Sequence, residues 1–251
     1  MKLACFTFRQ QPEVSAIVFP VVKKRVWPTF MFNDPVADAC WGHLEEDFPD
    51  FQFVLRDMDA DGTIAAVGHT IPFQWEGELP DDGWDGVFAK AIDDLKTGRT
   101  PNQITALEAV IAPEYQGKGF SRVVINQMRH IAQEHGFATL VAPVRPSWKA
   151  RYPLTPIEHY VRWKHDDGAA SFDPWLRTHE RMGASMVKIA SHSMRIPGTV
   201  GQWETWVGMR FPESGRYVIP GALNPIEIDC NKNEGVYVEP NVWMRHEICS
   251  K

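Results

Sequence analysis

Apolar and polar residues follow two different periods in the middle of the chain, and each period predicts a different element. Every second residue from Phe51 to Leu55 is a large apolar one, and an apolar run resumes from Thr63 to Ile71 after the polar segment 59–62. We expect two strands joined by a turn here. The turn resembles the start of an EF-hand calcium loop, but Gly68 stands where that motif needs a bidentate glutamate, so ordinary turn chemistry explains it better.

The segment from 103 to 144 shows both periods in succession. Ile104–Ile111 is almost continuously apolar and predicts a central strand. A loop over 116–119 follows, and apolar positions then recur at helical spacing from Ser121 until Gly136, before a second predicted strand at Thr139–Val144. A strand, loop, helix and strand in this order bring free backbone N–H groups and the positive end of a helix dipole together. We therefore expect a phosphate group to bind at the loop.

Two common phosphate-binding loops do not fit this segment. Lys118 precedes Gly119 instead of following a spaced glycine pair, and Arg122 stands where a dinucleotide fingerprint needs its third glycine. The run Gln116–Ser121 instead resembles the signature Q/R-x-x-G-x-G/A of the GNAT superfamily of acyl-CoA-dependent N-acyltransferases, with serine at the last position. Residues 107–115 also resemble the strand and bulge that lead into this loop. A tight connection in some other α/β protein is the alternative.

This resemblance implies a fold and a site for acyl-CoA. The implied fold class is α/β (α+β), with a mixed, mostly antiparallel central sheet flanked by helices and two central strands that splay apart around the thioester. Loop N–H groups would hold the CoA diphosphate, and the edge of the first strand would pair with the pantetheine arm. The implied CoA-binding residues are Ala109, Val110, Ile111, Gln116, Gly117, Lys118, Gly119, Phe120, Ser121 and Arg122. The side chains of Lys118 and Arg122 either add charge near the phosphates or are simply solvated.

Two residues are candidates for proton transfer. An amine needs a base before it can attack, and Glu108 is the ionisable residue of the 104–111 run, where the family often carries a glutamate. The family's usual acid is a tyrosine in a late helix, and His179 stands at the matching place, after a predicted helix start at Asp173-Pro174. Imidazole is not equivalent to phenol, so His179 either serves the leaving thiolate or leaves that step to water. Both residues also have structural interpretations, a strand glutamate paired with a cation and a buried helix histidine.

The segment from 145 to 172 is long for a connection, and long loops in compact domains tend to be functional. We expect it to cover the acceptor site, with Arg145, Trp148, Tyr152 and Tyr160 as candidate substrate-binding residues. Its many cations suggest an acceptor with a carboxylate or phosphate, although a solvated basic face is the alternative.

The two ends of the chain give weaker patterns. Ala16–Val22 is β-branched enough for a strand, Pro35–Phe48 predicts a helix, and the acidic segment 81–86 predicts a turn. After 193 we expect closing strands of the same sheet at Tyr217–Ile219, Ile226–Asp229 and Val236–Met244. The chain is thus interpreted as one elaborated domain over 1–251, with a core at about 51–192, an insertion at 145–172 and a C-terminal extension at 193–251.

Composition restricts the partners and the location. The 251 residues have a net charge of −6 and a pI near 5.8, which argues against a nucleic-acid-binding surface. Cys5, Cys40, Cys230 and Cys249 form no C-x-x-C pair, so we expect reduced thiols, a cytoplasmic location and no metal site. No stretch is apolar enough for a membrane span. Tryptophan is as common as leucine, and six of the ten indoles follow residue 145, which indicates either a β-rich core or a pocket lined with rings.

The sequence therefore predicts an acyl-CoA-dependent N-acyltransferase. We expect it to move acetyl from acetyl-CoA, or another acyl group from its CoA ester, to an amine of a small molecule by direct attack. A non-catalytic acyl-CoA-binding or sensor module is the alternative, because the usual tyrosine is absent. A homodimer is possible, and neither the acceptor nor the acyl-chain length follows from the sequence.

Overall fold

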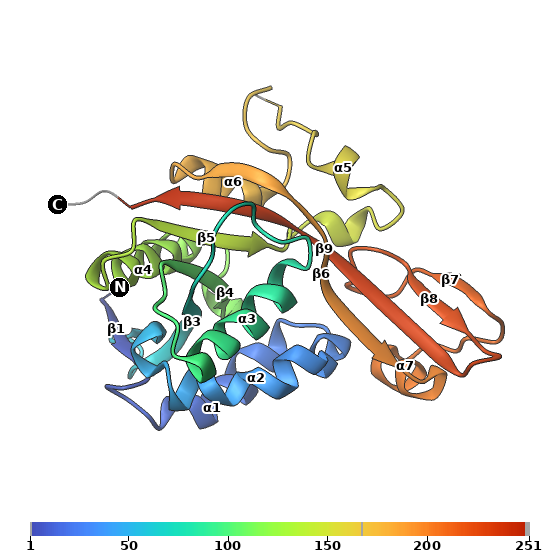
Figure 1. The fold of residues 1–251 in the computed structure, drawn as a ribbon, viewed down its shortest axis with the longest axis horizontal. Helices are drawn as coiled ribbons and strands as arrows, with labels where there is room; N and C mark the ends of the chain where they lie inside the picture. The colour runs from blue at the N-terminus through green and yellow to red at the C-terminus, as the bar shows by residue number, and fades with distance from the viewer. Residues whose placement is uncertain (1, 167, 249–251) are drawn as a thin grey trace.

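The computed structural model describes residues 2–166 and 168–248, and nine strands of this part of the chain form one sheet (Figure 1). Neighbouring strands are antiparallel except β4 and β5, which are parallel. The strands lie in the order β1 (Leu3–Thr7), β2 (Gln52–Asp57), β3 (Thr63–Phe73), β4 (Gln103–Ile111), β5 (Thr139–Val144), β9 (Glu234–Glu247), β8 (Ile226–Asp229) and β7 (Gly215–Tyr217), while β6 (Ser185–Gly198) pairs with β9. The mixed, mostly antiparallel sheet is as the sequence predicted.

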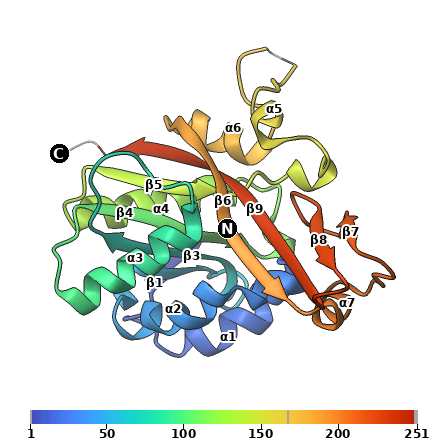
Figure 2. The ribbon, with the colours of Figure 1, turned by 45° about the vertical axis from the view of Figure 1, so that its right-hand side comes forward.

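Helices cover both faces of the sheet (Figures 1 and 2). On one face α1 (Val14–Val21), α2 (Pro35–Glu46) and α3 (Gly83–Thr97) pack on odd-numbered residues of β3, such as Val67 and Ile71. On the other face α4 (Phe120–Glu134) packs on Phe53, Leu55 and Ala66. The remaining helical segments are α5 (Ile157–Tyr160), α6 (Pro174–Arg181), α7 (Val200–Val207), η1 (Lys23–Arg25), η2 (Thr29–Asn33), η3 (Pro49–Phe51), η4 (Pro113–Tyr115) and η5 (Lys149–Arg151).

The elements with clear periodicity lie where the sequence places them. β2 and β3 form the expected hairpin, and its turn puts Asp61 and Gly62 at positive φ. Helix α2 begins after Asp34, whose Oδ1 accepts hydrogen bonds from the N–H groups of Val36 and Ala37 at 2.9 and 3.0 Å. The predicted strand at Ile226–Asp229 is β8. These agreements follow from local signals, namely alternation, a side-chain cap and turn residues.

Three expectations about the less regular segments are wrong. Ala16–Val22 is not a strand, because Val14, Val18 and Val22 are buried four residues apart and form one face of α1. The acidic segment 81–86 is not only a turn, because α3 begins within it at Gly83. The first residues of this helix are polar, so its apolar face was not recognised in the sequence. The segment between β6 and β7, for which the sequence predicted no element, contains helix α7. Of the first expected closing strand, Tyr217–Ile219, only Tyr217 belongs to a strand, β7.

Strand β9 joins the two halves of the sheet. Its C-terminal half pairs with β5, and its first residues pair with β8. Its opposite edge pairs with β6 from Gly235 to Arg245. Figure 1 shows β6 and β9 running away from the helices into an arm with β7, β8 and α7. That arm has its own apolar cluster around Trp203 and Tyr237.

Two buried carboxyl groups link α2 to α3. The side chains of Asp34 and Asp85 hydrogen bond to each other, so one proton must lie between them. Asp85 also accepts a hydrogen bond from the N–H of Arg195 on β6 at 2.8 Å. Burial, followed by the charge of Asp34, raises the pKa of Asp85 to about 8, and burial also raises the pKa of Asp34. The pair therefore ties α2, α3 and β6 together in its protonated form.

This pair predicts a loss of stability on raising the pH. A carboxyl whose folded pKa is raised binds a proton that the unfolded chain has lost. Its contribution to stability therefore falls as the pH rises from the unfolded pKa of about 3.9 to the folded pKa of about 8, by about 1.4 kcal/mol per pH unit. Between pH 5 and 8 we expect the free energy of unfolding of Asp85→Asn, measured in urea, to depend less steeply on pH than that of wild type. Asp93→Asn, on the same helix and exposed, should keep the wild-type slope. Parallel slopes for wild type and Asp85→Asn would contradict the shared proton.

Candidate active site

The sheet opens between β4 and β5. These parallel strands pair only through Ile104 with Leu140 and Thr105 with Val141, although both strands continue for several residues. Beyond these pairs a cavity of about 940 Å³ is lined by Ala106–Ala109 and Ile111 on one side and Ala142–Val144 on the other. The strands therefore splay as the sequence predicted, and they leave main-chain groups of β4 free for a ligand.

A bulge in β4 directs Glu108 into this cavity. Glu108 is opposite His69, whereas the next pair joins Ala106 to Thr70, so Leu107 is the extra residue. The carbonyl of Leu107 accepts a hydrogen bond from Trp84 Nε1 at 2.8 Å, which holds the bulge against α3. Consecutive residues Leu107 and Glu108 thus both line the cavity.

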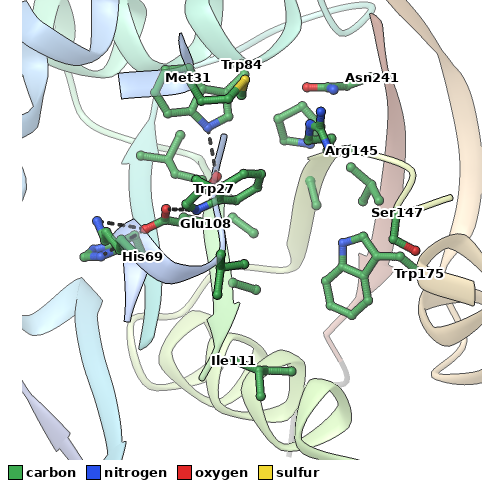
Figure 3. A pocket seen from close by; sticks show the side chains of 18 of the residues that line it. Trp27, Met31, His69, Trp84, Glu108, Ile111, Arg145, Ser147, Trp175 and Asn241 are labelled. Atoms are coloured by element: carbon green, nitrogen blue, oxygen red, sulfur yellow. Dashed lines mark hydrogen bonds and ion pairs between the residues drawn. The ribbon is translucent and has the colours of Figure 1, made fainter. Parts of the chain in front are cut away.

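Glu108 is buried and held by groups from the N-terminal segment (Figure 3). Its Oε1 accepts a hydrogen bond from Trp27 Nε1 at 2.7 Å, and its Oε2 lies 2.8 Å from Lys23 Nζ. Both side chains of the ion pair are nearly inaccessible, at 7% for Lys23 and 9% for Glu108. A buried carboxylate is stable only with such compensation.

Two buried bases near Glu108 have lowered pKa values. Burial lowers the pKa of Lys23 despite the opposing charge of Glu108, and its Nζ lies 3.7 Å from the centroid of the Trp41 ring. Burial, followed by the charge of Lys23, lowers the pKa of His69 well below its usual value. His69 is therefore neutral at physiological pH.

Gln52 fixes the tautomer of His69. Its Nε2 donates hydrogen bonds to the carbonyls of Phe48 and Thr70, so its Oε1 must accept from His69 Nδ1, 2.9 Å away. His69 Nε2 therefore carries a lone pair, and it faces Glu108 Oε2 at 3.5 Å. Two acceptors thus face each other beside the amine of Lys23.

The glycine loop leads from β4 into α4. Gly117 and Gly119 have φ of +73° and +83°, a conformation that favours glycine, and a Cβ at either would meet nothing within 4 Å. The N–H groups of Phe120 and Ser121 at the start of α4 have no acceptor inside the helix, whereas that of Arg122 donates to the carbonyl of Gly119 at 3.1 Å. Gln116 Nε2 donates to the carbonyl of Ile111 at 3.1 Å and ties the loop to β4. Open space beside an N-terminus that points free N–H groups outward fits the diphosphate of CoA.

The other residues expected at the CoA site lie in three different places. Ala109, Ile111, Gln116 and Ser121 line the cavity. Val110 and Phe120 are buried on the opposite side with α1, and the side chains of Lys118 and Arg122 are exposed beside the loop.

His179 also lines the cavity, from α6. Its Nδ1 lies 2.9 Å from His246 Nε2, whereas its Nε2 is buried without a hydrogen-bond partner among the described residues. Burial, followed by the charge of His246, lowers the pKa of His179 to about 3, and burial lowers that of His246 to about 4. His179 is therefore neutral and presents one ring nitrogen as either a donor or an acceptor.

The segment 145–172 contributes less to the cavity than the sequence suggested. Arg145 lines it, but Trp148, Tyr152 and Tyr160 are not among the lining residues. These three rings pack together with Trp163 and Phe172. Lys149 is also withdrawn, because it is fully buried and its Nζ donates to the carbonyls of Tyr152 and Leu223. Among the described residues of this segment, Arg145 is therefore the one cationic side chain that lines the cavity.

Arg145 is oriented by a fully buried acid. Its Nε lies 2.9 Å from Glu239 Oε1, and its Nη2 donates to the carbonyl of Gly221 at 2.6 Å. Glu239 accepts a further hydrogen bond from Tyr237, at 2.7 Å. Guanidinium has five N–H groups, so this arrangement leaves an edge of Arg145 for a ligand.

Most of the aromatic wall of the cavity comes from the N-terminal third of the chain, for which the sequence predicted no part in the site. Trp27, Trp41 and Trp84 line the cavity, whereas Trp175 is the single indole after residue 145 among its lining residues. Trp203 and Trp243 are instead completely buried in apolar clusters. The four-residue spacing of valines in α1 was the available signal that this segment is a helix packed on the sheet.

Two negative findings concern the residues that the structure describes. Within 2–166 and 168–248 no group of three or more His, Cys, Asp or Glu side chains could hold a metal ion. No helix in these ranges is long and apolar enough to span a membrane. Cys5, Cys40 and Cys230 are free thiols, and Cys249 lies outside the described residues.

Comparison with known proteins gives one related sequence and a set of related folds. No family model matches the chain. The sequence is 34% identical over 248 residues to arginine N-acetyltransferase avaD of Aspergillus versicolor, covering 89% of this chain and 86% of that protein. The GphF GNAT-like decarboxylase in complex with isobutyryl-CoA has a TM-score of 0.57 and 15% identity, covering 99% of this chain and 100% of that one.

The loading GNATL domain of CurA from Lyngbya majuscula has a TM-score of 0.53 and 16% identity, covering 98% of this chain and 97% of that one. These structural likenesses establish the fold, and the sequence relationship establishes the family. The chain therefore belongs to the GNAT superfamily and is an acyl-CoA-dependent N-acyltransferase.

Proposed function

We propose that this enzyme transfers acetyl from acetyl-CoA to a nitrogen of a small, cationic, arginine-like acceptor by direct attack. The observation that carries the proposal is the aromatic cavity at the opening between β4 and β5, with the buried carboxylate of Glu108 inside it. The 34% identical relative named arginine N-acetyltransferase supports the choice of acceptor. A sensor that only binds acyl-CoA needs no buried carboxylate beside the thioester, so the non-catalytic alternative is not favoured.

The charges of the cavity suit a cationic acceptor. The lysine and the arginine among its lining residues are Lys23 and Arg145. Lys23 forms an ion pair with Glu108, and Arg145 forms one with Glu239. The carboxylates of Asp38 and Glu45, both exposed on α2, also belong to the lining and leave a surplus of negative charge. Guanidinium groups also bind well over indole rings, which this cavity supplies.

The proposed mechanism assigns a task to each part of the site. Acetyl-CoA supplies the acetyl group as a thioester. The N–H groups at the start of α4 hold the diphosphate, and the free edge of β4 orients the pantetheine. Glu108 takes the proton of the attacking nitrogen. His179, which is neutral, donates a hydrogen bond from its Nε2–H to the leaving sulfur, and the thiolate then takes up a proton to give free CoA. The free edge of Arg145 suits a carboxylate of the acceptor.

We further infer that the described chain works as one domain in the cytoplasm. Strand β9 belongs to the sheet of the cavity through β5 and to the arm through β6 and β8, so neither part has a complete sheet alone. The free thiols of Cys5, Cys40 and Cys230 suit a reducing compartment.

The choice of acceptor can be tested by steady-state release of CoA thiol. We expect turnover with arginine and a kcat/KM at least about tenfold lower with citrulline, which has a similar shape but no positive side chain. The double variant Asp38→Asn, Glu45→Gln should raise KM for arginine and leave KM for acetyl-CoA nearly unchanged. Equal rates with arginine and citrulline would contradict recognition by charge.

The role of Glu108 can be tested with Glu108→Gln. Loss of a general base is expected to lower kcat about a hundredfold near pH 7. The difference in kcat between the variant and wild type should become smaller as the pH rises, because a larger fraction of the acceptor then binds in its unprotonated form. Glu227→Gln, at an exposed position of β8, serves as a matched control and should keep the wild-type rate. An unchanged rate for Glu108→Gln at saturating acceptor would rule out the proposed base.

The role of His179 can be tested with His179→Leu and His179→Gln. Removing the ring nitrogen in the leucine variant should lower kcat about tenfold, with a smaller effect on KM for acetyl-CoA, whereas glutamine should retain part of the rate through its amide. Because the pKa of His179 is lowered to about 3, the pH profile between 5 and 8 should keep its shape in both variants. A leucine variant with the full rate would mean that water protonates the thiolate.

A further inference from the structure

Lys23 meets the geometric requirements for an acyl acceptor within its own active site. Its Nζ lies 2.8 Å from Glu108 Oε2, within the hydrogen-bond distance that a base needs from the proton it removes. The side chain lines the cavity and is only 7% exposed. A primary amine belonging to the chain thus lies beside the carboxylate that is proposed to deprotonate the substrate.

Burial of Lys23 favours the reactive, neutral form of the amine, although the charge of Glu108 opposes this effect. Only a neutral amine has a lone pair for attack, and burial lowers the pKa of Lys23. Glu108 Oε2 and the lone pair of His69 Nε2, 3.5 Å apart, are both acceptors. Trp41 covers the ammonium from one side, with its ring centroid 3.7 Å from Nζ. By contrast, the neighbouring Lys24 is exposed and is not among the lining residues.

The thioester is expected within reach of this amine. Glu108 directly precedes Ala109, where the free edge of β4 borders the cavity, and the same cavity continues to Gln116 and Ser121 at the start of α4. The 3₁₀ turn η1 carries Lys23 into this space from the N-terminal segment. We propose that Lys23 is a self-acetylation site, at which the enzyme transfers acetyl from acetyl-CoA to its own Nζ when no acceptor fills the cavity. The inference rests on the proposed role of Glu108.

The reaction is balanced without any further reactant. The neutral Nζ forms a bond to the acetyl carbonyl carbon, and the carbon–sulfur bond breaks with its electron pair leaving on sulfur. The proton lost by Nζ passes to Glu108, and the thiolate takes up a proton to give free CoA. The products are one acetyl-lysine and one CoA for each acetyl-CoA consumed.

Self-acetylation would change the site itself. The amide of acetyl-lysine carries no charge, so both the ion pair with Glu108 and the cation–π contact with Trp41 would be lost. The added acetyl group would also occupy the place where an acceptor nitrogen meets Glu108. Accumulation of acetyl-Lys23 should therefore slow turnover.

The test is incubation of the purified full chain with isotopically labelled acetyl-CoA and no acceptor, followed by intact-mass measurement and peptide mapping. We expect one acetyl group per chain, located on Lys23 and not on Lys24. The rate constant should be independent of protein concentration, because the transfer is intramolecular. Excess arginine should slow the labelling, Glu108→Gln should slow it by at least about tenfold, and Lys23→Arg should remove it.

Two results would overturn the inference. One is an unlabelled Lys23 in wild-type protein, and the other is equal labelling of Lys24 and other exposed lysines, which indicates uncatalysed chemistry. Turnover of arginine measured in the same samples separates this failure from failure of the proposed function. Acetylated arginine with an unmodified Lys23 would reject self-acetylation alone, whereas the absence of both products would reject both proposals.

Discussion

The active site depends on the separation of two parallel strands in the middle of the sheet. β4 and β5 share only two residue pairs, and an unpaired main chain inside a protein needs another partner. Pro143 in β5 has no N–H to offer, and the bulge at Leu107 interrupts the regular pattern of β4. The free edge of β4 is therefore open to a ligand that can pair with it. Every other part of the site is arranged around this opening.

The carboxylate of Glu108 at the opening couples the N-terminal segment to strand β4. Glu108 cannot be buried alone, and its compensation by Trp27 and Lys23 comes from residues more than eighty positions away in the sequence. The ion pair anchors η1 over the cavity, and Trp84 anchors the bulge from α3. The aromatic wall of the cavity is thus built on the helices of one face of the sheet, while the glycine loop leads into α4 on the other.

The sequence predicted the elements around the glycine loop much better than the aromatic wall of the cavity. The loop at 116–119, the start of α4 and strands β4 and β5 carry local signals, because periodicity, glycine at positive φ and a six-residue motif all lie within one segment. The aromatic wall of the cavity has no such local signal. Lys23, Trp27 and Trp41 meet Glu108 only through tertiary packing, and the aromatic residues of 145–172 bind one another because that segment needs its own core.

Strand β9 sets a limit on how this chain can change in length. It carries Glu239 and Asn241 to the cavity and His246 to His179, and its register is fixed along both edges by β5, β6 and β8. A single inserted residue within 235–246 would turn every later side chain to the opposite face and misplace both ends of the site. The turn before Glu234, with Asn233 at positive φ, lies outside this constraint. Variation in length among relatives should therefore concentrate at the tip of the arm, far from the chemistry.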